Sequence, residues 1–393
     1  MDRHAWKPFL QRWSEERRIA HPGEEPGGDP WLGCPPATED EVQALEARLG
    51  CVLPPSFREF LLVTNGWRHA GNFVWSLRGT EEIGWLTDLE PMWAETWVDR
   101  EVKYEDPAAA RSLLISLRAD AGVVYLDPGD VDERGEWAAY DVFSWRARGS
   151  ERHGSFHEKM YHFYAEFHAL DRPRCETQRE WDATVEDARL ASLRGEVDRP
   201  LAVFAQAARF GRDRASFLLF QMRTLLRSED SDLFYPRPTK SDDTGSWTLD
   251  EDLFAAQVLP LLSAARQQAR RFGSDSMPRS RQDRRSQRVK YQFPGDGRTQ
   301  RVERPLGRHQ ARREEPAFRV CFGDPEFDAA AHAALDAGED AWPRLLDALV
   351  HWRPLHEDHI APIALLADPR AARLPRGFPP ARAAPERSAS SPE

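Results

Sequence analysis

Histidine is the residue whose spacing first suggests chemistry in this chain, because imidazole binds metals and transfers protons near neutral pH. Seven of the 12 histidines form two groups, which are His153, His157, His162 and His168, and then His351, His356 and His359. A zinc protease needs H-E-x-x-H on one helix. His356-Glu357-Asp358-His359 has the wrong spacing, and His157 and His162, five residues apart, face different sides of a helix. We therefore predict no metal site.

Carboxylates are the second candidate, in the segment DPGDVDERGE at residues 127–136. The segment lacks the residue order and the closing glutamate of a calcium loop. An acidic hairpin loop is the better interpretation, and such a loop could offer a negative patch to a basic protein partner. The candidate partner-binding residues are Asp127, Asp130, Asp132, Glu133 and Glu136.

Motifs for nucleotide binding and for an activated serine are absent, since the chain has no Walker loop, no G-x-G-x-x-G and no G-x-S-x-G. A catalytic triad is a spatial arrangement, so a serine or cysteine nucleophile stays open, although nothing suggests one. The four cysteines lie far apart without C-x-x-C, which argues against a disulfide framework and a zinc knuckle. We predict a protein that is not an enzyme and that uses no cofactor.

Charge is unevenly distributed along the 393 residues, whose formal net charge is −11. From Arg266 to Arg313, 15 Arg or Lys stand against 4 Asp or Glu, so the rest of the chain is strongly acidic. An acidic body favours a basic partner and disfavours nucleic acid as its ligand. The arginine-rich segment could contact nucleic acid or an acidic partner, but its few aromatic residues favour a solvated linker.

Membrane and export signals are missing from the sequence. No apolar run approaches the length of a membrane span. The N-terminal residues MDRHAWKPFLQRW carry charge where a signal peptide needs an apolar core. We therefore predict a cytoplasmic location and no membrane partner.

The elements that would position these residues begin with helices. An amphipathic helix is expected over 2–18, and Thr38 with Glu41 predicts a capping box at the start of a second. Gly50 ends that helix, and the double proline at 54–55 begins a third that stops at Asn65-Gly66. A helix over 155–170, capped by Ser155, closes this region.

Short strands are predicted between these helices, over 73–77, 83–86, 113–117, 123–126 and 137–143, with a short helix over 89–97. Strands in the middle with helices at both ends indicate an α+β fold. Most tryptophans should be buried, and the candidates for exposure are Trp67, Trp75, Trp93 and Trp97.

The rest of the chain divides by composition into four segments. We expect an all-helical extension over 176–272 and a disordered arginine-rich linker over 273–315, which is too poor in aliphatic residues to offset ordering. A small helical segment over 316–369 is a marginal core by itself and could dock on the extension. Residues 370–393 are expected to be a disordered tail.

Residues 1–175 carry a succession of motifs. An acidic helix is followed by "LG..LP..[YF]..FL...NG" from Leu49 to Gly66. A tryptophan helix over 6–13, a hairpin with Asp120, Gly122 and Tyr125-Leu126-Asp127, and a "GEW" segment at 135–137 accompany it. In this order the motifs resemble the SUKH superfamily. The family-motif residues, mainly structural, are Trp6, Leu53, Pro54, Phe57, Phe60, Asn65, Gly66, Gly122, Asp127, Gly135 and Trp137.

This resemblance implies a twisted, mostly antiparallel sheet covered by helices, and a domain that binds proteins. The leading hypothesis is an immunity protein that neutralises a bacterial toxin, such as a basic nuclease. The alternative is an intracellular adaptor or regulator of several host proteins, like the fungal members. The helical extension and the length of the chain favour that alternative.

Overall fold

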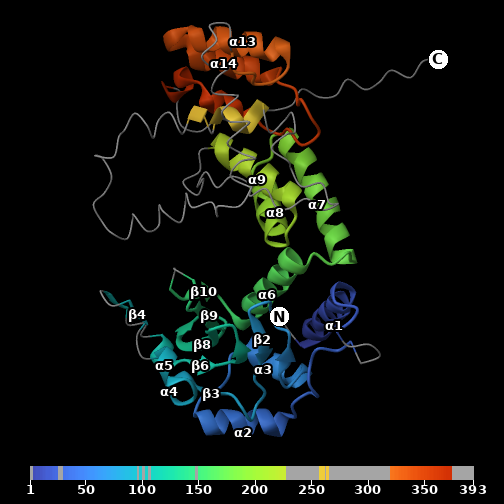
Figure 1. Ribbon diagram of the computed structural model, residues 1–393, viewed down its shortest axis with the longest axis vertical. Helices are drawn as coiled ribbons and strands as arrows, with labels where there is room; N and C mark the ends of the chain where they lie inside the picture. The colour runs from blue at the N-terminus through green and yellow to red at the C-terminus, as the bar shows by residue number, and fades with distance from the viewer. Residues whose placement is uncertain are drawn as a thin grey trace, which may run out of the picture. The chain divides into compact units, whose positions relative to one another are not determined.

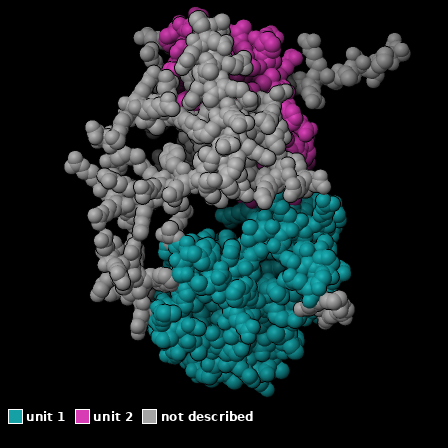
Figure 2. Space-filling model, viewed as in Figure 1, with its two compact units in different colours: residues 1–179, 209–211 teal, residues 180–208, 212–393 magenta. Residues whose placement is uncertain are grey.

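The computed structural model describes residues 3–24, 30–94, 97–99, 102–104, 108–146, 149–226, 256–261, 263–264 and 319–373. The chain forms two compact units (Figures 1 and 2). Unit 1 comprises Met1–Arg179 with Arg209–Gly211, and unit 2 comprises Glu180–Ala208 with Arg212–Glu393. Among the described helices, none has a stretch long and apolar enough to cross a membrane.

Unit 1 begins with three helices, α1 (Arg3–Ala20), α2 (Glu39–Leu49) and α3 (Pro55–Val63). The predicted capping box is present, because the Thr38 side chain accepts from the Glu41 N–H while the Glu41 carboxylate accepts from the Thr38 N–H. Gly50 ends α2 in the left-handed conformation, with φ of 71°. Both features follow from the local sequence alone.

Two antiparallel sheets fill the middle of unit 1. The first has the order β1 (Trp67–Arg68), β2 (Val74–Leu77), β7 (Ser116–Ala119). The second has the order β10 (Glu151–His153), β9 (Trp137–Phe143), β8 (Gly122–Val131), β6 (Leu113–Leu114), β3 (Gly84–Trp85). A separate hairpin pairs β4 (Trp97–Asp99) with β5 (Val102–Tyr104). The α+β prediction is confirmed.

Short elements differ from the predicted ones. The strand expected over 113–117 is divided between the two sheets, since β6 pairs with β8 whereas β7 pairs with β2. Residues 112–116 are all buried, so alternation of polar and apolar residues could not reveal the break. The short helix expected over 89–97 is replaced by α4 (Leu86–Leu89) and α5 (Pro91–Ala94). The 3₁₀ turn η1 (Ala109–Arg111) precedes β6.

The main aromatic core of unit 1 lies where α1, α3 and α6 (Phe156–Asp171) meet (Figure 1). The ring centroid of Trp6 lies 5.4 Å from that of Phe60 and 5.7 Å from that of Phe156. Phe60 and Phe156 are themselves 5.0 Å apart. Ser155 caps α6 by accepting from the Glu158 N–H, as predicted. These aromatic contacts, two edge-on and one tilted, fix the helices that cover the sheets.

Unit 2 is helical, as predicted for the extension. Its helices are α7 (Glu176–Leu193, whose first residues belong to unit 1), α8 (Asp198–Arg209), α9 (Asp213–Leu226), α13 (Pro325–Asp336) and α14 (Ala341–Val350), with 3₁₀ turns η2 (Gly338–Asp340), η3 (Ile363–Ala367) and η4 (Pro369–Arg373). Buried Gln221 holds the chain at Asp358 and Ile360, and buried Gln257 holds it at Phe322 and Ala364. Residues 319–373 therefore pack on the helices before them.

Two predicted boundaries need comment. The expected disordered linker over 273–315 lies outside the described residues. The disordered tail was predicted to start at residue 370. That boundary is too early, because Ala371 is fully buried and Arg370 bonds to Asp368 and Asp336. The prediction was made from amino-acid composition, which cannot show that Arg370 binds two carboxylates. The rest of that tail, 374–393, lies outside the described residues.

Candidate functional site

The first half of the predicted acidic loop, residues 127–131, is strand. β8 continues through Val131, so the turn to β9 spans only residues 132–136. Asp132 N–H donates to the Glu136 carbonyl (2.9 Å), and Gly135 supplies the positive φ of 80° that closes the turn. The bulge between Asp127 and Val131 lengthens the strand beyond the apolar run that defined the prediction.

Asp127 is not available to a partner, which corrects its predicted role as a partner-binding residue. Its residue exposure is 1%, and its two oxygens accept from Arg111 Nε at 2.6 Å and Nη2 at 2.7 Å. The Gly129 N–H donates to the same carboxylate (2.8 Å). A buried carboxylate held by a bidentate guanidinium anchors β8 to η1.

The other hairpin carboxylates are also engaged, with one exception. Asp130 accepts from Arg152 and from the Tyr140 hydroxyl, which lowers the pKa of Asp130 to about 2. Asp132 accepts from two backbone N–H groups of its own turn. Glu133 is exposed and is the one predicted carboxylate here with no bond assigned in the described structure. The hairpin is thus a paired structural element more than a free negative patch.

Glu136 links the hairpin to α3. Its carboxylate accepts from the Ser56 N–H (2.9 Å) and the Ser56 hydroxyl (2.6 Å), although 80 residues separate the two in sequence. The N-cap of α3, Pro54, has no side-chain acceptor, so Glu136 performs the capping function from another element. This bond joins two motifs that the sequence analysis treated separately.

We expect Glu136→Gln to reduce the free energy of unfolding by about 1–2 kcal/mol, because the amide keeps one acceptor but loses the charge at a helix N-terminus. Urea denaturation of the full chain measures the change. Glu133→Gln, on the same turn but exposed, is the matched control and should change stability by less than about 0.5 kcal/mol. Equal effects of the two substitutions would contradict the capping role.

The family-motif residues occupy structural positions. Trp6, Leu53, Phe57, Phe60 and Trp137 are buried, as is Pro54. Asn65 exchanges side-chain hydrogen bonds with Thr80, and Gly66 has a φ of 111°. At Gly122, a Cβ would collide with the Phe143 ring. Asp127 and Gly135 have the hairpin roles described above.

An acidic segment that sequence reasoning missed lies over residues 81–92. Asp88 and Glu90 lie there beside Leu89 and Met92, whose exposures are 40% and 75%. Glu81 is exposed, and no ion pair joins Glu81, Asp88 or Glu90 to another described residue. The sequence does carry a signal for this segment, because every charged residue between Arg78 and Arg100 is acidic.

Two tryptophans expose half of their surface. Trp75, predicted as a candidate, is 50% exposed, and Trp145, which was not, is 49% exposed. The Trp145 ring centroid lies 4.9 Å from that of Phe73 and 5.1 Å from that of Phe143, and Arg146 Cζ lies 5.8 Å from the Trp145 ring centroid. Trp67 is buried, contrary to the suggestion that it could be exposed.

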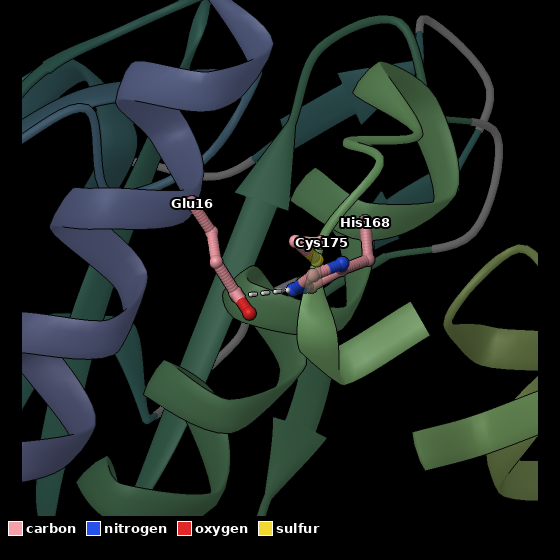
Figure 3. Close-up of side chains that lie close together, drawn as sticks. All are labelled: Glu16, His168 and Cys175. Atoms are coloured by element: carbon pink, nitrogen blue, oxygen red, sulfur yellow. Dashed lines mark hydrogen bonds and ion pairs between the residues drawn. The ribbon is translucent and has the colours of Figure 1, made fainter. Parts of the chain in front are cut away.

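A buried polar cluster joins α1 to α6 and to the connection that follows it (Figure 3). Glu16 accepts from His168 Nε2 (3.0 Å) and from the Tyr164 hydroxyl. Burial opposes ionisation of Glu16, yet the hydrogen bonds from His168, Tyr164 and Thr177 lower its pKa to about 2. Cys175 lies in the same cluster, and burial raises the pKa of its thiol to about 11.

A second buried cluster joins β9 and β10 to α6. Lys159 is fully buried and pairs with Asp141, which also pairs with Arg146. His153 Nε2 lies 3.3 Å from Lys159 Nζ, and the rings of His153 and His162 are 4.8 Å apart. Burial, reinforced by Lys159, lowers the pKa of His153 to about 3 and that of His162 to about 4. Both rings are therefore neutral at physiological pH.

Comparisons with known proteins point in the same direction as these motifs. No curated protein and no solved structure matches the chain. The model of the SMI1 / KNR4 family (SUKH-1) matches residues 36–166, from before α2 into α6, and this confirms the resemblance inferred from the motifs. Residues 36–166, which lie in unit 1, are therefore similar to the SMI1 / KNR4 family (SUKH-1).

Proposed function

We propose that unit 1 is a non-enzymatic protein-binding domain that acts as an immunity protein, neutralising a basic bacterial toxin such as a nuclease. The observation that carries this proposal is the acidic segment over 81–92. Its carboxylates form no ion pair within the described part of the chain, although Arg78 interacts electrostatically with Glu82 and Glu90, and exposed Leu89 and Met92 lie beside Asp88 and Glu90.

Charged and apolar side chains have different effects on binding at such interfaces. Unpaired carboxylates accelerate encounter with a basic partner without first breaking an internal ion pair. Exposed apolar side chains then slow dissociation, and tryptophan is among the residues that contribute most at interfaces. Met92 supplies an apolar anchor within the acidic segment, and Trp75 and Trp145 supply aromatic ones elsewhere on unit 1.

The partner is identified first by affinity capture from lysate of the source cells, with the full chain as bait. One dominant basic protein supports the immunity function. Several partners would instead support the adaptor function, for which the presence of a second unit with its own core is the favouring observation. Enzymatic assay of the captured protein, with and without the full chain, then tests neutralisation directly.

With that partner, the triple variant Glu81→Lys, Asp88→Lys, Glu90→Lys should lower the association rate constant by roughly tenfold or more at low salt. The difference from wild type should shrink as salt rises, because screening acts on both proteins. Glu133→Lys in the β8–β9 turn is the control, because it reverses the charge of one exposed carboxylate outside the acidic segment. Unchanged association of the triple variant, measured by surface plasmon resonance, would rule out this segment as the steering surface.

A further inference from the structure

Three side chains with different metal-binding atoms meet inside unit 1. Glu16 comes from α1, His168 from the last turn of α6, and Cys175 from the connection to α7 (Figure 3). Their exposures are 4%, 0% and 3%. One ligand atom of each lies within 4.8 Å of the other two, so small shifts of the side chains would bring all three onto one ion.

Neutral hydrogen-bond partners surround the three side chains. Gln178 Nε2 lies 3.1 Å from His168 Nδ1, so the Gln178 amide orients the imidazole ring. The Tyr164 hydroxyl donates to Glu16 and lies 3.0 Å from the Thr177 hydroxyl. No Lys or Arg side chain is among these partners, so none of them would repel a bound cation.

We propose that Glu16, His168 and Cys175 bind one Zn²⁺, or a similar thiophilic divalent ion, within unit 1. Carboxylate oxygen, imidazole nitrogen and thiolate sulfur are the donors that zinc takes in proteins. One Zn²⁺ with a carboxylate, a neutral imidazole and a thiolate has no net charge, which favours burial of the whole site. The Tyr164 hydroxyl, which bonds to the same Glu16 oxygen, is the candidate for the fourth ligand.

The surroundings of His168 suit such a role. Metal-binding histidines are oriented by a hydrogen bond from the ring nitrogen that faces away from the metal. Gln178 occupies that position, and rotation of its amide by half a turn would present oxygen to a protonated Nδ1. The ion would then tie α1 to the end of α6 and to the α6–α7 connection.

The other histidine cluster is a poorer site for a cation. Glu151, His153 and His162 also lie within reach of one another. However, the ammonium group of Lys159 lies 3.3 Å from His153 Nε2 and repels a second cation. This difference supplies a control for the experiment.

Cobalt titration of the metal-free full chain tests the proposal. Co²⁺ bound to a thiolate gives a near-ultraviolet charge-transfer band, which we expect to saturate at one equivalent and to disappear when Zn²⁺ is added. Cys175→Ser should abolish the band, and Glu16→Gln should weaken Co²⁺ binding by about tenfold or more. Cys34→Ser, which removes a thiol outside the cluster, and His162→Gln should leave the titration unchanged.

The wild-type titration decides the matter even where a variant fails to fold, which circular dichroism would reveal. Absence of a thiolate band in wild type would overturn the proposal, and so would a band that persists in folded Cys175→Ser. A Zn²⁺-dependent rise in the melting temperature of wild type that is lost in Cys175→Ser would support it. None of these outcomes depends on the protein partner proposed above.

Discussion

Asp141→Ala is expected to lower the free energy of unfolding by about 3–5 kcal/mol, because it removes the counter-charge of a fully buried lysine. Lys159 has no exposed surface and Asp141 exposes 1%. Burial alone would raise the pKa of Asp141, but Lys159 and Arg146 hold that pKa below its ordinary value. Urea denaturation followed by tryptophan fluorescence measures the loss.

The matched control is Asp130→Ala, which also breaks an aspartate–arginine pair of unit 1. Asp130 and Arg152 expose 30% and 53% of their side chains, and exposed pairs contribute about 1 kcal/mol or less. A second variant, Lys159→Met with Asp141→Ala, buries no unpaired charge and should recover most of the loss. If Asp141→Ala and Asp130→Ala cost the same, the buried pair is not a main support of the α6–β9 contact.

The helix ends of unit 1 were predictable because they depend on local sequence. The capping box at Thr38, the left-handed Gly50 and the Ser155 cap each depend on a few neighbouring residues, and all three are present as predicted. The α+β class followed from the order of such elements. Strand ends were less predictable, because the β8 bulge and the division of β6 from β7 depend on partners elsewhere in the sheets.

The candidate sites could not be derived in the same way. Asp127 and Glu136 looked like free carboxylates in an acidic segment, since Arg111 and Ser56, which engage them, are not their neighbours in sequence. Glu16, His168 and Cys175 form no motif at all, and only the packing of α1 against α6 brings the first to the other two. Side chains that meet across 150 residues leave no periodic signal.

Acid should destabilise unit 1 well before its carboxylates titrate. An unfolded histidine takes up a proton near pH 6.5, whereas folded His162 and His153 do so only near pH 4 and pH 3. The folded state therefore binds fewer protons between these values, so stability is complete above pH 6.5 and falls as the pH drops. Each histidine contributes a slope of about 1.4 kcal/mol per pH unit in that window.

Below pH 4.5 Glu16 adds to the loss, because its pKa of about 2 in the folded state lies under the ordinary value. Denaturation in urea at a series of pH values from 7.5 to 4 would measure these slopes. His162→Gln should reduce the slope between pH 6.5 and 4 by about one histidine's share, whereas His351→Gln, at an exposed position of unit 2, should not. A free energy of unfolding that stays constant from pH 7 to pH 5 would mean that His153 and His162 are solvated in solution.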